Sequence, residues 1–169
     1  IHVWEQPEGL AGKDWEVPVI EVDAEVKKAF DTYKVVGFYA DPAMWESYIA
    51  GWEAAYHQRL KAKASSKHPI EWWINQGRSI LVTRALEQFH SAVVDKELTH
   101  DGSSTLTRHV LNARRRVQRG GLWIAKDHPD STRKIDAAWA SVLAYAARLD
   151  ALASGVLNTA PTFTPRRIR

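Results

Sequence analysis

A short apolar run that directly follows an amphipathic stretch is the feature that most restricts how this chain can fold. Over Val19–Tyr33, apolar residues recur at the spacing of one helix face. The next run, Val35–Ala40, is apolar throughout, which favours a strand buried on both faces, as in a parallel sheet. Asp41 is a favoured N-cap residue and Pro42 suits a first helical turn, so we expect a helix from there to about His57.

The rest of the sequence continues this alternation of helices and short strands. Three further strands are expected, at Ile1–Glu5, Ile70–Ile74 and Leu122–Ala125. Three further helices are expected, over Gly77–Leu98, from Ser103 or Ser104 to Gly120, and over Thr132–Ser154. The alternation predicts an α/β class, and 169 residues suffice for one domain. We expect that domain to cover residues 1–155, followed by an irregular basic tail over 156–169.

Composition excludes several classes of site. The chain has no cysteine, which removes disulfides, thiolate zinc sites and cysteine nucleophiles. Its apolar runs are too short to cross a bilayer. It has no glycine-rich phosphate loop, so ATP binding is not expected. The seven histidines show no ligand spacing on a helix, which argues against a zinc site.

Basic residues gather locally although the net charge is only +3. Five arginines fall within twelve residues, and the predicted helix would align four hydrogen-bond donors on one face: Arg108, Asn112, Arg115 and Arg119. Such a face can follow a phosphate backbone, and a solvated helix face explains it equally well. Lys126, at the end of the last predicted strand, can reach a phosphate or orient a water molecule, although a surface lysine is the commoner case.

Two aspartates are the candidate acidic groups. Asp41 follows the buried strand, at the edge where open α/β sheets bind ligands, and a helix-capping role would also explain it. Asp136 falls on the helix flank that it shares with Leu143, where a carboxylate needs a partner. Lys134 or Arg133 would supply that partner as an ion pair. Alternatively, both carboxylates hold Mg²⁺ or Mn²⁺, cations that take oxygen ligands and support phosphodiester hydrolysis.

Three ordered stretches and the opening of the chain carry a family resemblance. The stretches are "VVGFYADPAMW", "LTHDGSSTLTRHVLNAR" and "IAKDHPDSTRKIDAAWASVLA", and the opening is "VWEQPEG...DWEVPVIEVDAEV". Together they resemble the C-terminal nuclease domain of tailed-phage terminase large subunits, notably actinobacteriophage members, over roughly residues 1–155. The resemblance implies a ribonuclease H-like mixed sheet flanked by helices. It also implies an endonuclease that cuts concatemeric double-stranded viral DNA during packaging into the prohead.

The resemblance also implies roles for individual residues. Asp41 in "YADP" and Asp136 in "KIDAA" match acidic residues that hold two Mg²⁺ or Mn²⁺ ions and act in catalysis. His109 and Asn112 match an "H..NA" portion with structural or DNA-facing roles. The DNA-facing set then comprises six residues: Arg108, Asn112, Arg115, Arg119, Lys126 and Lys134. The implied partners are double-stranded DNA, the portal protein and the small terminase subunit, with no membrane. The implied location is the host cytoplasm and, transiently, the prohead portal.

The chain departs from that family at its start. The family's first acidic residue lies on the first strand, in a D-G-S-like context, and nothing before Ile1 supplies it. Since the first residue is not Met, we expect the chain to begin inside a longer polypeptide that holds two more strands and an ATPase domain. Without one of three carboxylates the chain should bind metal weakly and be inactive alone. The alternative is a non-catalytic module that grips DNA or docks on the portal; a resolvase or transposase core ranks last.

Overall fold

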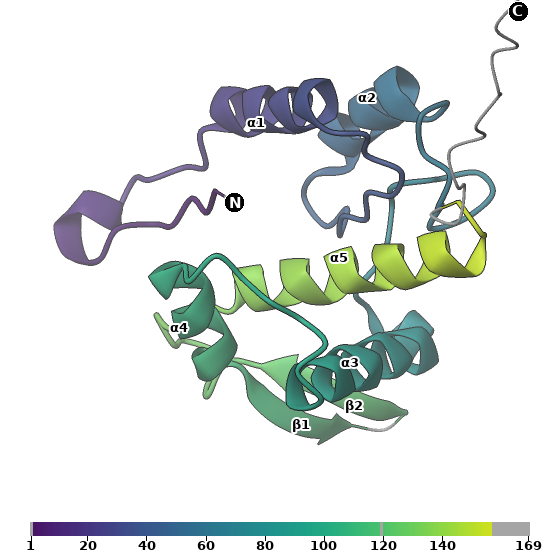
Figure 1. The fold of residues 1–169 in the computed structure, drawn as a ribbon. Coiled ribbons are helices and arrows are strands. Elements are labelled where there is room, and N and C mark those ends of the chain that lie inside the picture. Colours follow the sequence, from purple (N-terminus) through teal and green to yellow (C-terminus); the bar gives the residue numbers. More distant parts are fainter. Residues whose placement is uncertain (1, 119, 157–169) are drawn as a thin grey trace, which may run out of the picture.

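A computed structural model describes residues 2–118 and 120–156 (Figure 1). The α-helices in this part of the chain are α1 (Val19–Thr32), α2 (Glu46–Tyr56), α3 (Ser79–Val94), α4 (Ser104–Asn112) and α5 (Asp136–Ala153). Two short 3-10 helices are η1 (Gly9–Gly12) and η2 (Gln76–Arg78). Strands β1 (Arg114–Gln118) and β2 (Gly121–Ala125) form one antiparallel hairpin. The expected mixed α/β class is confirmed, with less sheet than the sequence predicts.

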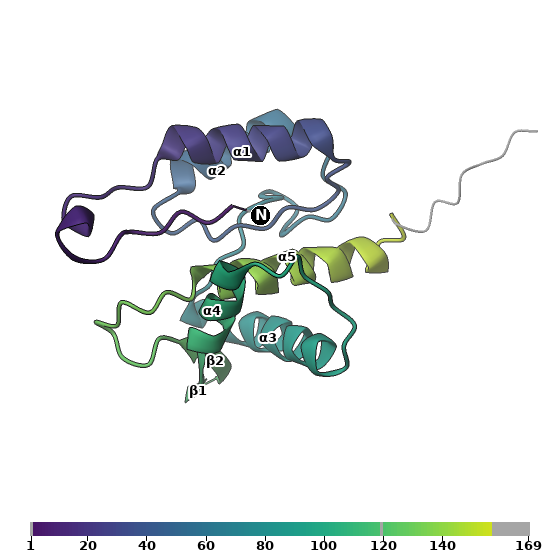
Figure 2. The ribbon, with the colours of Figure 1, turned by 60° about the vertical axis from the view of Figure 1, so that its left-hand side comes forward.

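Helix α5 runs through the middle of the molecule. In both views α1 and α2 lie on one side of α5, and α3, α4 and the hairpin lie on the other (Figures 1 and 2). One buried cluster joins α3 and α5 through Tyr39, Trp72, Val82, Ala85, Leu86, Val142, Leu143 and Ala147. A second cluster holds α1 and α2 together through Phe30, Ile49, Trp52, Leu60 and Ile70. Burial of these apolar groups is the main source of the stability of the fold.

The extended segment 35–40 lies between the two clusters. Tyr39 belongs to the α3/α5 cluster, whereas Phe38 and Ala40 pack against the α1/α2 cluster. Consecutive side chains therefore face opposite sides, as in a strand. Ala40 forms a parallel bridge with Glu71, and its carbonyl accepts a 2.8 Å hydrogen bond from the N–H of Trp72. The packing on both faces agrees with the prediction, but the strands predicted at 35–40 and at Ile70–Ile74 are wrong, because their parallel pairing is limited to a single bridge.

The helix expected directly after this segment starts later than predicted. α2 begins at Glu46, because Met44 has a φ of 67° and this left-handed conformation interrupts any helix that starts at Pro42. Asp41 therefore does not cap α2. Elsewhere α1 agrees with the prediction, α3 is shorter at both ends, and α5 begins at Asp136 rather than Thr132. Residues 2–5 form no strand.

The helix predicted to reach Gly120 is wrong in its second half. Ser103 caps α4 as expected, since its hydroxyl oxygen accepts a 3.2 Å hydrogen bond from the N–H of Leu106. α4 ends at Asn112, and the arginines that follow form β1. β1 pairs with the apolar strand β2, which is anchored on α3 by a 2.8 Å bond from the N–H of Leu122 to the hydroxyl of Thr83. This tertiary pairing overrides the helix propensity of the arginines.

Candidate functional site

Asp41 lies where the extended segment ends. It is half-buried, and its Oδ1 accepts a 3.3 Å hydrogen bond from the N–H of Ile74. This bond ties the end of segment 35–40 to the segment that runs parallel to it. It uses one carboxylate oxygen, so the other oxygen and the second lone pair of Oδ1 can still bind a cation.

Asp136 is the first residue of α5 and is exposed to solvent. The sequence places it on a partly covered flank, and that placement is wrong: the covered part of the flank begins further along the helix, at Leu143. Neither expected cation pairs with it, because Arg133 pairs with Asp127 at 3.5 Å and Lys134 makes no ion pair with a described residue. In the described ranges, no side chain forms a hydrogen bond or ion pair with the Asp136 carboxylate. Its negative charge at a helix N-terminus is favourable.

A buried histidine holds the start of α5. His109 on α4 is 0% exposed. Its Nδ1 accepts a 2.9 Å hydrogen bond from the N–H of Ala137, the residue after Asp136. Because Nδ1 is an acceptor, Nε2 carries the ring hydrogen and donates it to Glu5 Oε1 at 2.7 Å. The imidazole therefore links the first turn of α5 to the N-terminal segment of the chain.

Glu5 joins His109 and Arg108 in one hydrogen-bond network. Its two carboxylate oxygens accept hydrogen bonds from the two terminal nitrogens of Arg108, at 3.1 and 2.7 Å, and one of them also receives the bond from His109. The Arg108 guanidinium lowers the pKa of Glu5 to about 2, against a partial burial that acts in the opposite direction. Two-pronged pairs of this kind are among the stronger hydrogen bonds in proteins. The network thus joins three segments that are distant in sequence.

The predicted basic helix face does not exist, because its members lie on different elements. Arg108 is engaged by Glu5, and the side-chain amide of Asn112 donates a 3.0 Å bond to the carbonyl of Lys134. Arg115 lies on β1, and Arg119 lies outside the described residues. Lys126 follows β2 and is half-buried, as is Lys134. Among the residues that the structure describes, a dense group of arginines remains on the hairpin.

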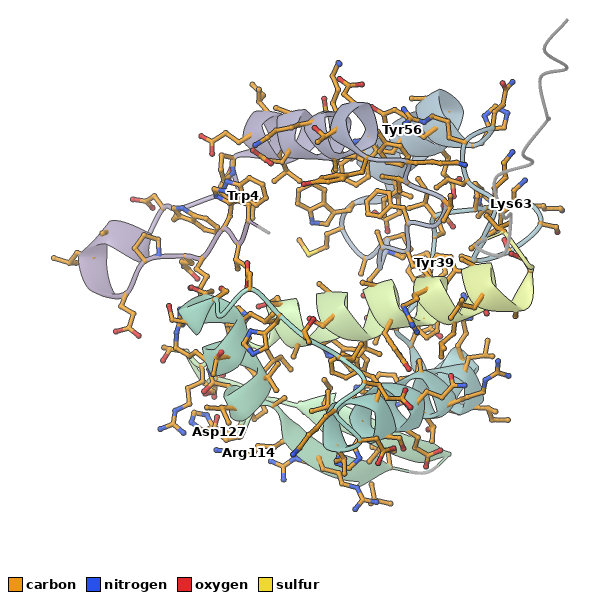
Figure 3. The ribbon with its side chains drawn as sticks, viewed as in Figure 1. Trp4, Tyr39, Tyr56, Lys63, Arg114 and Asp127 are labelled. Atoms are coloured by element: carbon orange, nitrogen blue, oxygen red, sulfur yellow. The ribbon has the colours of Figure 1, made fainter. Side chains whose placement is uncertain are left out.

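That hairpin is an exposed basic surface. All five residues of β1 are exposed, and in a strand Arg115 faces away from the side that Arg114 and Arg116 share. Arg116 donates a 2.7 Å bond to the carbonyl of Asp127, and Figure 3 shows Arg114 and Asp127 at the same edge of the molecule. Arg115 makes no side-chain hydrogen bond to a described residue. Its guanidinium is therefore available to a partner.

One group of three side chains of the types that ligate metal ions is not predicted from the sequence. Glu53 on α2, His68 and Glu71 place their donor atoms within 4.8 Å of one another. The fold already uses these atoms: Glu53 Oε1 accepts bonds from the backbone N–H groups of Ile70 and Glu71, and Glu53 Oε2 lies 3.2 Å from His68 Nδ1. Over residues 2–118 and 120–156 it is the only such group of three, so neither Asp41 nor Asp136 belongs to one.

Comparison with known proteins finds two bacteriophage relatives. The chain is 39% identical over 155 residues to the gene 13 protein of Mycobacterium phage L5, which covers 91% of this chain and 25% of that protein. It is 39% identical over 160 residues to the gene 13 protein of Mycobacterium phage D29, covering 94% of this chain and 26% of that protein. The chain thus spans about a quarter of the length of these relatives. The likeness supports the expectation of a phage protein.

No family model matches the chain, and no solved structure matches it. None of the helices in the described ranges has both the length and the apolar character needed to span a membrane.

Two residues of the network around α5 escaped sequence reasoning. Glu5 is not identified from the sequence, because its partners lie more than a hundred residues away and no local pattern marks it. The sequence indicates His109 only through the "H..NA" portion of the family resemblance. Its pairing with α5 has no signal in the sequence, which predicts that this helix begins at Thr132. In the structure the N-cap position is occupied by Ile135, whose side chain cannot accept a hydrogen bond.

Proposed function

We propose that this chain is part of a metal-dependent endonuclease, the ribonuclease H-like nuclease domain of a phage terminase large subunit, which cuts concatemeric double-stranded DNA during genome packaging. One observation carries the proposal. Asp136 stands exposed, with no partner among the described side chains, at the start of α5, and α5 packs against the extended segment that ends at Asp41. Two oxygen-donor side chains thus belong to two elements that pack directly on each other.

The residues suit a hard divalent cation. Carboxylate oxygens are the ligands that Mg²⁺ and Mn²⁺ prefer, and both aspartates keep free lone pairs. Two bound ions would supply an activated water and stabilise the leaving oxygen of a phosphodiester. The protein's own contribution is to hold Asp41 by the N–H of Ile74 and to hold the first turn of α5 by His109. The positive end of α5 adds to the attraction for phosphate.

The surroundings fit a polyanionic substrate. The exposed arginines of β1 and the half-buried Lys126 and Lys134 supply positive charge. Such contacts position a duplex without reading its sequence. Under this proposal the partners are double-stranded DNA, the portal protein and the small terminase subunit. The site of action is the prohead portal in the host cytoplasm.

The test compares three aspartates with two measurements. Mn²⁺ affinity, measured by calorimetry, and plasmid cleavage are both measured with a polypeptide that also carries the expected upstream acidic residue. The same measurements are made on its Asp41→Asn, Asp136→Asn and Asp150→Asn variants. Losing a side chain that only supports a metal ligand typically weakens binding or activity about 10–100-fold, so losing a ligand should cost at least about 100-fold. Asp150→Asn, at the other end of α5, should change neither measurement by more than about twofold.

The outcomes separate a metal site from two ordinary surface aspartates. Equal loss for Asp41→Asn and Asp136→Asn, with Asp150→Asn unaffected, supports the nuclease. Continued cleavage after both changes, in a polypeptide that keeps its fold by circular dichroism, would show that the catalytic assignment is wrong.

A second function is favoured by the basic hairpin. The exposed Arg115 and its neighbours on β1 suit a module that grips DNA or docks on the portal without cutting. DNA binding of that kind ignores Mg²⁺ and weakens steeply with salt, because each neutralised phosphate releases counterions. Arg115→Ala should then reduce the slope of log affinity against log salt by about one. An unchanged slope would remove Arg115 from the DNA-binding surface.

A further inference from the structure

Helix α5 has no cap of its own. The residue at its N-cap position is Ile135, whose side chain cannot accept a hydrogen bond. The first backbone N–H groups of any helix lack partners within the helix, and an uncapped first turn frays. In this molecule the missing acceptor comes from another helix: the Nδ1 of His109 accepts the N–H of Ala137 at 2.9 Å. Asp136 is the residue immediately before that bond.

The imidazole is fixed in its turn. His109 is fully buried, and both ring nitrogens are used. Glu5 accepts the Nε2 hydrogen at 2.7 Å and also accepts hydrogen bonds from both terminal nitrogens of Arg108. A ring held at both edges has one tautomer and one orientation. The position of the Ala137 N–H is therefore set from outside the helix, by groups on α4 and on the N-terminal segment.

We infer that His109 is a positioning residue for Asp136, an inference that rests on the proposed metal role of that aspartate. By holding the N–H of Ala137, His109 keeps the first turn of α5 formed and the Asp136 carboxylate in one place. A metal ligand has to be held to within about 0.5 Å of its working geometry by supporting hydrogen bonds. Asp136 has no such support on its own carboxylate among the described residues, so the support acts through the backbone.

The experiment separates positioning from simple stability. Mn²⁺ affinity is measured by calorimetry in the longer polypeptide that carries the upstream acidic residue, for the wild type and for the His109→Ala, His109→Asn and Asp150→Ala variants. His109→Ala removes the acceptor and should weaken Mn²⁺ binding about 10–100-fold, as the loss of a supporting hydrogen bond typically does. His109→Asn keeps an acceptor oxygen near the position of Nδ1 and should stay within about threefold of the wild type. Asp150→Ala breaks a bond at the far end of the same helix and should leave Mn²⁺ affinity unchanged.

A second pair of variants covers the case in which His109→Ala fails to fold. His109→Gln retains a donor toward Glu5 but lacks an acceptor at the Nδ1 position, whereas His109→Asn retains the acceptor and loses the donor. Positioning predicts that the Asn variant binds Mn²⁺ and the Gln variant does so at least about tenfold more weakly. Hydrogen exchange of the Ala137 amide, followed by NMR without metal, should be fast in the Gln variant and slow in the Asn variant.

Each result decides a different point. If Asp136→Asn weakens Mn²⁺ binding but His109→Ala and His109→Gln do not, the positioning role is overturned and the metal site stands. If Asp136→Asn itself leaves Mn²⁺ binding unchanged, the proposed function fails and the positioning role falls with it. Weakening by Asp150→Ala to the same degree as by His109→Ala would also overturn the inference, since general loss of stability would then explain both.

Discussion

The two ends of α5 each carry an exposed aspartate and are each tied to a distant part of the chain, but by different groups. At the C-terminal end the Asp150 carboxylate accepts a 2.7 Å hydrogen bond from the hydroxyl of Tyr39. At the N-terminal end the tie runs through the backbone, from the N–H of Ala137 to His109. Figure 3 shows Tyr39 beside the C-terminal half of the helix. One carboxylate is used by the fold, and the other, on Asp136, is left available for a ligand.

Removing each of these two hydrogen bonds should show which end of α5 contributes more to the free energy of unfolding. His109→Ala leaves the N–H of Ala137 without an acceptor inside the protein and removes a buried ring, so it should lower the free energy of unfolding by about 1–3 kcal/mol. Tyr39→Phe removes one hydrogen bond, and the exposed Asp150 recovers water, so the loss should be about 0.5–1.5 kcal/mol. Urea unfolding followed by circular dichroism measures both.

We expect His109→Ala to lower the free energy of unfolding more than Tyr39→Phe does. Ser103→Ala, which removes the cap of α4, serves as a reference with an expected cost of about 1 kcal/mol. A His109→Ala variant as stable as the wild type would mean that water replaces the imidazole at the start of α5. The contrast between the two ends would then disappear.

The parts of the fold that the sequence predicts are those that depend on residues close in sequence. Local patterns predicted α1, the cap at Ser103 and the two-sided packing of segment 35–40. Each of these depends on residues close in sequence, where spacing and side-chain chemistry suffice. The candidate aspartates came from the family resemblance and from their places next to predicted elements.

What could not be predicted depends on contacts between distant residues. The arginines after Ala113 have good helix propensity, and only pairing with β2, itself bonded to Thr83 of α3, makes them a strand. Asp41 has the chemistry of an N-cap, but α2 begins only at Glu46, after the left-handed backbone of Met44. The Asp41 carboxylate instead accepts a hydrogen bond from the N–H of Ile74. The exposure of Asp136 depends on where tertiary packing begins along α5. A helical wheel does not contain that information.

Low pH and high pH should each weaken the contacts at a different end of α5. The Arg108 guanidinium holds the pKa of Glu5 at about 2, below its ordinary value of 4.5. A lowered folded-state pKa gives stability that is present above about pH 4.5 and is lost as the pH falls toward 2. At the other end, burial and then the hydrogen bond to Asp150 raise the pKa of Tyr39 above its ordinary value of 10.0. That stability is present below about pH 10 and is lost as the pH rises further.

Two variants test the assignment of the two pH limits. Glu5→Gln should flatten the acid side of a plot of urea midpoint against pH and leave the alkaline side unchanged. Tyr39→Phe should do the reverse. If Glu5→Gln leaves the acid side as steep as in the wild type, other carboxyl groups control acid unfolding, and the Glu5 network contributes little to the N-terminal end of α5.

The smallest expected effect on the free energy of unfolding is that of Asp136→Asn, which tests directly whether the fold uses this carboxylate. Asp136→Asn should change the free energy of unfolding by no more than about 0.5 kcal/mol, because the exposed carboxylate has no described partner and loses only part of its favourable interaction with the helix N-terminus. Asp150→Ala, which leaves the Tyr39 hydroxyl without its acceptor, should cost about 1 kcal/mol or more. The shifts in urea midpoint of the two variants, each measured against the wild type, give the relative size of the two losses in free energy of unfolding. A larger loss for Asp136→Asn than for Asp150→Ala would mean that the fold uses the Asp136 carboxylate after all, so the carboxylate would no longer be free to bind a metal ion.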